Sequence, residues 1–408
     1  MKLNEYDVIV VGAGPAGSTA AHFLAKDNAG FDVLILDRKT NVGVPVQCGE
    51  AIGKSKKELE MIEIPEHAII QEIRGFRVYS PDGTPVDWIN KEVQGYIVDR
   101  RIFDKELLAQ AAEAGTDVKL GANVLDVIYE DKKVKGVRGE ILGEPFEVEA
   151  RIVIGADGVN SRIAKAVELR KRIPPRELDT SVGFDMVNVE VDRPDLMEFY
   201  VGKEIAPRGY VWIFPKGETR ANVGIGIGVG FGEEGKNALH YLQDFMENHP
   251  IGSRKCKKAQ MIEFRVGAIP LGGLNKNGIV ADNVMLVGDA AGQVSPITGG
   301  GMSYGMVGGQ IAGKTAAEAL DRADSSSTFL QRYADRWIDM YGETFENHLK
   351  MRIALEKATD QQLDNLASVL TGEDVLELVK GKLRKAKLAA RIARKDVSLL
   401  KLLAGLLK

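Results

Sequence analysis

The sequence predicts an α/β protein in which a doubly wound domain carries an inserted β-rich domain and is followed by a helical C-terminal region. Three observations lead to this fold class. The apolar runs 6–12 and 31–37 flank a helical pattern over 15–26, which is the strand, helix, strand order of a parallel sheet. Segment 181–230 is rich in β-branched and aromatic residues broken by Gly and Pro, which is typical of an antiparallel sheet. Residues 326–408 show a mostly helical pattern.

The remaining elements follow along the chain and set the expected domain boundaries. A turn at 81–83 separates short strand-like pieces, and a helical pattern returns over 101–114. Further patterns predict strands at 118–124, 125–155 and 279–287, a helix near 235–248, and a small-residue stretch at 290–319 with a helical second half. We therefore expect a doubly wound domain from residues 1–71, 96–170 and 266–320, a β-rich domain from 72–95 and 171–265, and a helical region over 321–408.

Composition excludes several classes of protein. The 408 residues carry 54 Lys and Arg against 58 Asp and Glu, so the net charge of −4 lacks the cationic excess that nucleic acid attracts. The two cysteines, Cys48 and Cys256, are too few for a disulfide framework, and neither they nor the histidines stand at metal-ligand spacings. An apolar strand begins by residue 8, and no run of 18 apolar residues occurs. We expect a cytoplasmic protein without metal and without a membrane-spanning segment.

The C-terminal tail, residues 380–408, differs from the rest of the chain. It holds ten Lys and Arg against Asp396 alone, so the net charge of the tail is +9. Because the whole chain has a net charge of −4, the other residues carry −13. Its leucines recur at spacings compatible with an amphipathic helix. Two interpretations stay open. The tail binds an anionic membrane surface, or it is a solvated basic helix whose leucines pack on the protein itself.

The strongest local motif is GxGxxG. Gly12, Gly14 and Gly17, with Ala16 between them, stand directly after the first strand and open the first helix. In this context the glycines permit a tight turn and a close approach to pyrophosphate, and the helix N-terminus offers free N–H groups. Asp37 ends the second strand, where its carboxylate would accept ribose hydroxyls. The motif predicts a dinucleotide but does not distinguish FAD from NAD.

Two later motifs indicate FAD by resemblance. Residues 155–162 (GADGVNSR), which contain Asp157, and residues 288–292 (GDAAG), which contain Asp289, are similar to motifs of flavoproteins that resemble p-hydroxybenzoate hydroxylase. At the end of a strand, Asp289 can bind the ribityl hydroxyls. The turn ending in Gly300 and Gly301 places bare N–H groups at a helix start, where they would face the flavin pyrimidine and stabilise its reduced, anionic form.

Residues 308–315 (GGQIAGKT) also fit the Walker A pattern letter by letter. That pattern cradles phosphate only as a loop between a strand and a helix. Here the stretch falls inside the helix expected after Gly301, so we do not expect ATP binding.

A longer signature resembles the geranylgeranyl reductase family. Residues 207–215 (PRGYVWIFP), followed by Gly224 and Gly226, match its PxxYxWxFP…GxG pattern, most closely that of archaeal digeranylgeranylglycerophospholipid reductases. The resemblance covers roughly residues 6–320 and implies reduction of the geranylgeranyl chains of isoprenoid ether phospholipids in membrane lipid biosynthesis. It also implies FAD contacts at Ala16, Asp37, Cys48, Gly49, Ala51, Arg100, Val124, Asp289, Gly301 and Met302.

The signature also suggests where the substrate binds. Tyr210, Trp212 and Phe214 alternate along a strand and so project to one face. Because Gly224 and Gly226 alternate in the same way, an aromatic wall opposite a glycine floor would form a slot for a long apolar chain. The alternative is an ordinary sheet core with glycine where another element approaches.

The expected reaction is hydride delivery from reduced FAD to an alkene. The ring faces of Tyr210 and Trp212 would stabilise developing positive charge by about 0.5–2 kcal/mol each. Cys48 is either a positioned proton donor or a small residue that fits beside the cofactor. The alternatives are a flavin monooxygenase and a non-catalytic prenyl-lipid-binding flavoprotein, because fold does not fix chemistry. No second dinucleotide motif appears, so the electron donor is expected to be a protein such as ferredoxin or a reduced deazaflavin.

Overall fold

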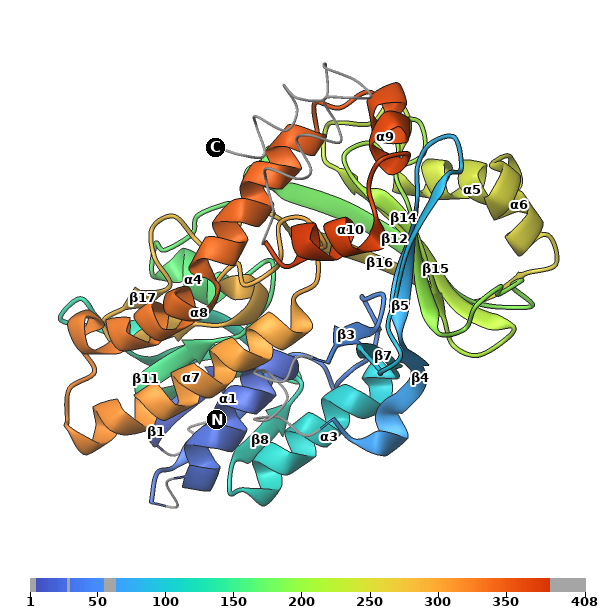
Figure 1. The fold of residues 1–408 in the computed structure, drawn as a ribbon. Helices are drawn as coiled ribbons and strands as arrows, with labels where there is room; N and C mark the ends of the chain where they lie inside the picture. The colour runs from blue at the N-terminus through green and yellow to red at the C-terminus, as the bar shows by residue number, and fades with distance from the viewer. Residues whose placement is uncertain (1–4, 28–29, 55–63, 382–408) are drawn as a thin grey trace.

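The computed structural model describes residues 5–27, 30–54 and 64–381. Two large sheets lie side by side, a small three-stranded sheet lies between them, and the C-terminal helices run across both (Figure 1). This arrangement confirms the predicted fold class, including the helical C-terminal region. The basic tail lies, apart from Lys380 and Gly381, outside the described residues.

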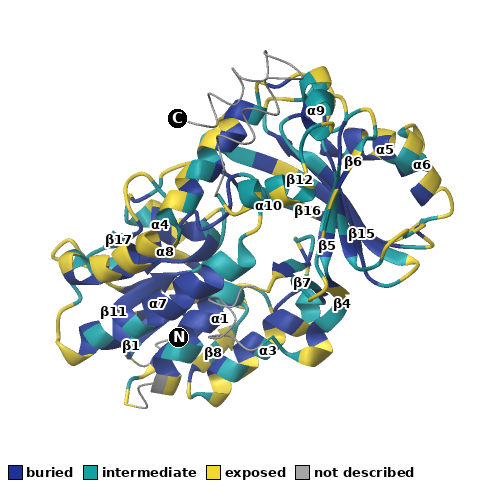
Figure 2. Cartoon of the chain, viewed as in Figure 1, coloured by how far each residue is buried: buried dark blue, intermediate teal, exposed yellow. Residues whose placement is uncertain are grey.

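The first sheet has eight strands. Its main path runs β17 (Val280–Ala281), β18 (Val284–Leu286), β11 (Glu144–Gly155), β1 (Tyr6–Val11), β2 (Val33–Asp37) and β8 (Asp117–Leu120), with β9 (Ala122–Glu130) and β10 (Lys133–Ile141) attached to β11 through β10. The pairs from β18 to β8 are parallel. This is the predicted doubly wound core, and its central strands are almost entirely buried (Figure 2).

Helices α1 (Pro15–Asp27) and α7 (Met302–Asp321) pack against each other over this sheet (Figure 1). The Walker-like stretch lies inside α7, as predicted. A Cβ atom added to Gly309 or Gly313 would stand well inside 3.0 Å of the α1 backbone. These two glycines therefore permit close packing of the helices and are not part of a phosphate loop.

The second sheet has seven strands. Its order is β16 (Gln260–Pro270), β12 (Leu178–Val187), β15 (Arg220–Gly228), β14 (Tyr210–Pro215), β13 (Leu196–Tyr200), β5 (Gly75–Tyr79) and β6 (Pro85–Ile89). All neighbouring pairs are antiparallel except β13 and β5. Helices α5 (Ala238–Glu247) and α6 (Pro250–Cys256) follow β15 in the chain, and α5 packs on β12 and β15. Strand β16 crosses the boundary expected at 265/266.

The third sheet connects the two larger ones. It is formed by β3 (Ala51–Gly53), β7 (Gly95–Val98) and β4 (Ile69–Ile73), and it is followed by α3 (Arg100–Glu113). Short helices occur at Glu66–Ala68, Arg162–Ala166 (α4), Pro175–Glu177 and Gly288–Ala290. Strand β3 directly follows the Cys48–Glu50 segment, so this sheet fixes that segment between the two large sheets.

The C-terminal helices are α8 (Ser327–Leu355), α9 (Asp360–Ala367) and α10 (Gly372–Val379). Helix α8 packs on α7, whereas α10 packs on β6 of the second sheet. The Trp88 indole donates a hydrogen bond of 3.0 Å to Glu373 at the start of α10. Among the described residues, no helix is both long and apolar enough to cross a membrane.

Candidate functional site

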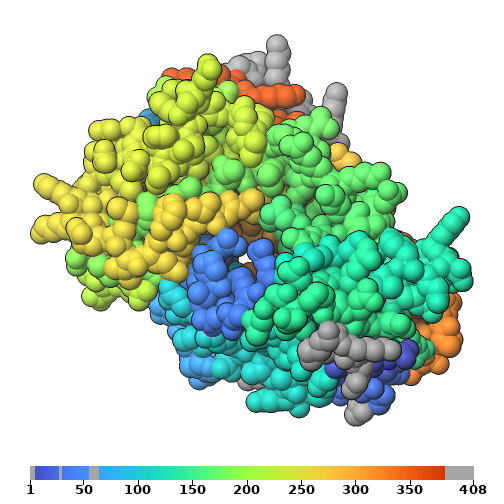
Figure 3. All heavy atoms as spheres, turned by 180° about the vertical axis from the view of Figure 1, so that it is seen from behind, coloured from blue at the N-terminus to red at the C-terminus, as the bar shows by residue number. Residues whose placement is uncertain are grey.

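A cavity of about 790 Å³ lies between the first and second sheets. One end is formed by the glycine-rich turn and the start of α7, and the other by the aromatic face of the second sheet. Figure 3 shows the surface hollowed beside the blue atoms of the segment around residues 45–54. The predicted site residues that line the cavity are Gly14, Ala16, Cys48, Gly49, Ala51, Arg100, Tyr210, Trp212, Phe214, Asp289, Gly300, Gly301 and Met302.

The glycine-rich turn has the geometry that the motif requires. Gly12 has φ +109°, and a Cβ atom there would stand within 3.0 Å of the Ala156 backbone. A Cβ atom on Gly17 would collide with the Gly12 carbonyl. The Asp37 carboxylate accepts a 2.7 Å hydrogen bond from the Ala13 N–H. Gly12, Gly17 and Asp37 therefore shape the turn, although they do not line the cavity.

Two predicted cofactor residues have other partners. The Asp157 carboxylate accepts hydrogen bonds from the Ser161 hydroxyl at 2.5 Å and from the Arg162 N–H at 2.6 Å, so it caps the start of α4. The Val124 carbonyl accepts a 3.4 Å bond from the Arg162 guanidinium. Neither residue lines the cavity. In the structure Asp157 positions the loop beside the cavity, and its direct contact with FAD stays a prediction.

Arg170 joins the two flavoprotein-like motifs and was missed in the sequence. Its guanidinium donates to the Val159 carbonyl at 2.8 Å and to the Asp289 carbonyl at 3.0 Å. It holds the loop after β11 against the loop after β18. Because these loops are more than 100 residues apart, no local pattern identifies this arginine.

The start of α7 fits an anionic group. Gly301 is the N-cap residue and has no side chain to bond the first free N–H groups of the helix. The Asp289 carboxylate lies beside Gly301, lines the cavity, and has no hydrogen-bond donor among the described residues. Burial raises its pKa, while Arg100 and Arg170 oppose that effect. A half-buried carboxylate without a donor among the described residues, next to free N–H groups, matches the ribityl hydroxyls and the pyrimidine edge of FAD.

The Cys48–Glu50 segment forms another wall of the cavity. The Cys48 sulfur accepts the Glu50 N–H at 3.2 Å, and Gly49 lies so close to the Phe214 ring that a Cβ atom there would collide with it. Arg100 binds Asp104 through two bonds of 2.6 and 2.8 Å. Burial alone would lower the pKa of Arg100, but Asp104 and Cys48 raise it above its ordinary value. A permanent cation therefore lies next to Cys48.

The aromatic residues of β14 share one face, as the alternation predicts. Trp212 lies between Tyr210 and Phe214, with ring centroids 6.1 and 6.0 Å away. Phe199 of β13 adds an edge-on contact at 5.3 Å to both Tyr210 and Phe214. Phe199 and its neighbours Phe76, Val78 and Met197 also line the cavity, and none of them was predicted from the sequence. The alternating pattern of β5 and β13 could have suggested them, but not which sheet face they share.

The predicted glycine floor has a different role. Gly224 pairs with Trp212 and Gly226 pairs with Tyr210 on the adjacent strand. A Cβ atom on Gly224 would stand within 3.0 Å of the Trp212 ring, so the indole lies directly over this glycine. Neither glycine lines the cavity. Gly224 therefore makes room for Trp212, and the further apolar lining of the cavity comes from the neighbouring strands β13 and β5 of the same sheet.

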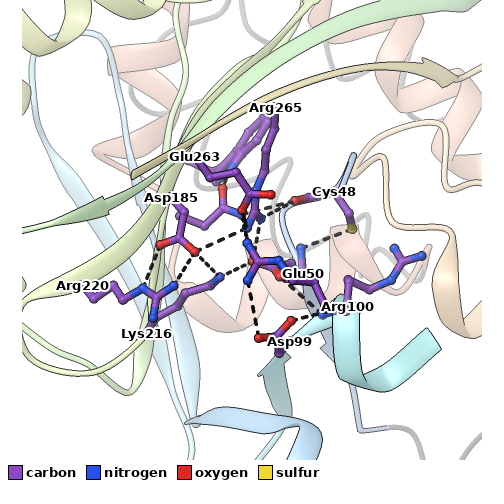
Figure 4. A network of polar contacts seen from close by, with 12 residues as sticks. Cys48, Glu50, Asp99, Arg100, Asp185, Lys216, Arg220, Glu263 and Arg265 are labelled. Atoms are coloured by element: carbon purple, nitrogen blue, oxygen red, sulfur yellow. Dashed lines mark hydrogen bonds and ion pairs between the residues drawn. The ribbon is translucent and has the colours of Figure 1, made fainter. Parts of the chain in front are cut away.

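A buried ionic network lies behind the Cys48–Glu50 segment (Figure 4). The Glu50 carboxylate pairs with Lys216 and, at 2.6 Å, with Arg265. The Asp185 carboxylate pairs with Lys216 and Arg220, both at 2.8 Å. Burial would raise the pKa of Glu50, yet Lys216 and Arg265 hold it below its ordinary value. The ion pairs from Glu50 to Lys216 and Arg265 therefore hold the Cys48–Glu50 segment on the second sheet.

Asn222 connects this network to the aromatic wall. The Trp212 indole N–H donates to the Asn222 side-chain oxygen at 2.9 Å. The amide nitrogen of Asn222 donates to the Cys48 carbonyl at 3.2 Å and to Glu50 at 3.3 Å. One buried side chain therefore fixes both the Trp212 ring and the backbone at Cys48. No group of three or more His, Cys, Asp or Glu side chains within the described ranges could hold a metal ion.

Comparison with known proteins agrees with this geometry. A family model for the geranylgeranyl reductase catalytic domain matches residues 177–269, and one for pyridine nucleotide-disulphide oxidoreductases matches residues 6–168. The chain is 42% identical to digeranylgeranylglycerophospholipid reductase 2 of Methanopyrus kandleri, over 99% of this chain and all of that protein. It is 41% identical to digeranylgeranylglycerophospholipid reductase of Methanocaldococcus jannaschii over the full length of both.

Solved structures are similar as well. A geranylgeranyl bacteriochlorophyll reductase-like protein of Thermoplasma acidophilum superposes with a TM-score of 0.87 at 33% identity, over the whole of both chains. A flavin-dependent brominase variant has a TM-score of 0.72 at 21% identity, over 92% of this chain and 94% of that one, and shows the fold alone.

Fold and site together define a flavin-dependent oxidoreductase of the geranylgeranyl reductase type. With about 40% identity to full-length relatives, the chain belongs to the digeranylgeranylglycerophospholipid reductase family. The family resemblance and the enzyme class predicted from the sequence are confirmed.

Proposed function

We propose that the protein is an FAD-dependent reductase that saturates the double bonds of geranylgeranyl chains on isoprenoid ether phospholipids. Family membership supports the reaction class and the lipid. One observation carries the proposal: a single cavity joins the start of α7 and Asp289 to the apolar face of β14, β13 and β5. A cofactor held at the first end would face a long apolar group held at the second.

The cofactor end would be held by residues of the first sheet. Asp289 and the free N–H groups at Gly301 and Met302 suit the ribityl chain and the pyrimidine edge, and the turn at Gly14 and Ala16 suits the pyrophosphate. When bound, reduced FAD supplies the hydride for the alkene.

The substrate end would be formed by Tyr210, Trp212 and Phe214 with the neighbouring apolar strands. These side chains exclude water and hold the chain along the sheet. The ring faces of Tyr210 and Trp212 stabilise positive charge that develops at the substituted alkene carbon. Trp212 lies at the middle of this wall, next to Gly49.

Cys48 is the proposed proton donor. It lies between the two ends of the cavity and is held by the Glu50 N–H. The Arg100 guanidinium lies beside it. The proton would be restored from water entering the cavity.

We further propose two partners. The electron donor is a protein such as ferredoxin or a reduced deazaflavin. GxGxxG occurs at residues 12–17, where it directly opens a helix, and again at 230–235, where it lies in the loop before α5 and opens no helix, so the sequence offers no second dinucleotide site of this type. The second partner is an anionic membrane surface, because the lipid substrate resides in a bilayer. The protein would therefore be cytoplasmic and peripherally associated with the membrane, with the basic tail 380–408 as one contact. In that location it could reach both the electron donor and the lipid.

Anaerobic photoreduction of the purified protein tests the function. We expect a yellow protein whose bleached flavin absorbance returns when a detergent-solubilised geranylgeranyl lipid is added, with a mass increase of two hydrogens per reduced bond. A flavin that stays reduced until oxygen is admitted, with no mass change in the lipid, would contradict the proposal. Oxygen incorporation into the lipid would instead identify a monooxygenase.

A further inference from the structure

Strand β16 presents an unusual apolar surface, which we call the β16 strip. It consists of Met261, Ile262, Phe264 and Val266, whose side chains are between 49% and 59% exposed. Strand β16 is an edge strand that pairs with β12 alone among the described strands. Four large exposed apolar residues on six consecutive positions of an edge strand usually mark an interaction surface.

The strip is exposed because the covering helices end one strand earlier. Val266 pairs with Val182 and Phe264 pairs with Phe184, so each pair shares a face of the sheet. On β12 these side chains are buried in the core formed with α5. On β16 the same apolar face continues beyond the helices and meets solvent.

The opposite face of β16 holds the strand in this orientation. Glu263 and Arg265 alternate with Ile262, Phe264 and Val266 and point into the ionic network, where Arg265 binds Glu50 and Glu263 (Figure 4). A register irregularity opposite Asp185 and Met186 pairs Met261 with Met186, so Met261 also lies on the face of the strip. Because successive side chains of a strand point to opposite faces, the strip cannot turn inward without breaking these buried pairs.

The cavity reaches the surface at the end of the strip. Val266 is 49% exposed and also lines the cavity, as do the next three residues of the strand. Gly267 lies beside Gln47, an exposed residue that lines the cavity from the other side. Figure 3 shows the surface of β16 next to that of the segment around residue 48, with the hollow between them.

We propose that the β16 strip docks on an anionic lipid bilayer and brings this opening to the lipid, an inference that rests on the proposed lipid substrate. Lys257 and Lys258, which precede the strand, are exposed and form no ion pair within the described part of the chain. An apolar strip flanked by unpaired cations matches the boundary between acyl chains and anionic headgroups. A stable subunit interface buries about 800 Å² per partner, more than a strip one strand wide provides.

Flotation with vesicles of phosphatidylglycerol and phosphatidylcholine tests the docking surface in the full-length protein. We expect Ile262→Ser/Phe264→Ser to lower the vesicle partition coefficient at least tenfold. Leu142→Ser, which changes an exposed leucine on the β10–β11 turn, is the matched control and should bind like wild type. All three proteins retain the basic tail, so the difference reports on the strip.

Phe264 also contacts the buried Phe184 ring, so its replacement could reduce vesicle binding by destabilising the fold. A second variant that leaves this contact in place controls for that effect. Lys257→Glu/Lys258→Glu changes exposed residues only and should weaken binding to anionic vesicles while leaving the weaker binding to neutral ones unchanged. Wild-type binding by both variants would overturn the proposal. So would a wild-type dimer in sedimentation equilibrium that Ile262→Ser/Phe264→Ser dissociates, because a second copy would then cover the strip.

Turnover of detergent-solubilised lipid separates this inference from the proposed function. We expect the strip variants to keep wild-type turnover in detergent. If vesicle binding depends on the strip but the protein reduces no lipid, the docking inference holds and the proposed reductase function is wrong.

Discussion

The Tyr210 hydroxyl donates a hydrogen bond to the Thr298 carbonyl. Tyr210 belongs to the aromatic strand of the second sheet, and Thr298 belongs to the turn that leads into α7 of the first. This bond therefore fixes the substrate wall relative to the proposed flavin site, across the cavity that separates the sheets. Burial raises the pKa of Tyr210, so the phenol stays protonated and remains a donor at neutral pH.

Tyr210→Phe should lower turnover about fivefold while flavin content stays unchanged. A typical hydrogen bond contributes about 1 kcal/mol, and here it aligns the two halves of the site. The matched control is Tyr129→Phe, which removes a 2.9 Å bond from β9 to the Ala166 carbonyl of α4, where neither residue lines the cavity. Denaturant unfolding and prenyl-lipid turnover would be measured for both. Equal loss of turnover in the two variants would show that Tyr210 acts through stability alone.

Gly224→Ala should displace the Trp212 ring, because the added methyl would stand within 3.0 Å of three of its carbon atoms. We expect a shift in tryptophan emission and a turnover at least tenfold lower, with FAD retained. Gly226→Ala, two residues along the same strand, is the control, since its Cβ would meet no atom closer than 3.9 Å. Similar behaviour of the two variants would show that the position of the indole does not matter for the reaction.

The sequence predicts the parts of this site that depend on local pattern. The turn at Gly12 and the common face of Tyr210, Trp212 and Phe214 follow from spacing within a few residues, and the carboxylate at Asp289 follows from the resemblance of residues 288–292 to a flavoprotein motif. The role of Gly224 was misjudged because it depends on the register between β14 and β15, which places Trp212 over it.

Contacts between distant segments could not be predicted in the same way. Asn222 meets Cys48 across 174 positions, and Arg170 meets Asp289 across 119. Their residue types carry no signal of their own, since Asn and Arg are common on surfaces. Tertiary packing alone makes them part of the site.

Asn222→Asp should reduce turnover about tenfold at pH 8 and recover part of it at pH 6. The new carboxylate still accepts the hydrogen bond from the Trp212 N–H but cannot donate one to the Cys48 carbonyl. A buried carbonyl left without its hydrogen-bond donor costs about 1–3 kcal/mol. The new carboxyl would be fully buried beside the Glu50 carboxylate, and both effects should raise its pKa well above the ordinary value of about 3.9. Its protonation as the pH falls restores one donor, so the ratio of variant to wild-type turnover should rise.

Asn248→Asp, on the exposed end of α5, is the control for this change and should show no such trend. A ratio that does not change with pH would show that the hydrogen bond from Asn222 to Cys48 has no part in positioning.

Asp185→Asn should destabilise the protein by about 3 kcal/mol at neutral pH, and the difference should narrow in acid. The Asp185 carboxylate is buried between Lys216, Arg220 and Arg265, so removing its charge leaves cations unpaired. Burial would raise its pKa, but Arg220 and Lys216 lower it to about 2, below its ordinary value of 3.8. A carboxylate whose pKa falls on folding stabilises the protein above its ordinary pKa and loses that contribution as the pH falls towards the folded value.

The gap in unfolding free energy between wild type and Asp185→Asn should therefore shrink by about 1 kcal/mol between pH 6 and pH 3. Urea unfolding followed by circular dichroism across that range would measure it. Asp126→Asn breaks an exposed pair with Arg138 at 2.8 Å and is the control, expected to change stability by less than about 0.5 kcal/mol at any of these pH values. If the gap for Asp185→Asn stays constant from pH 6 to pH 3, the carboxylate is not held ionised by its three cations, and the ionic network behind Cys48 does not depend on its charge.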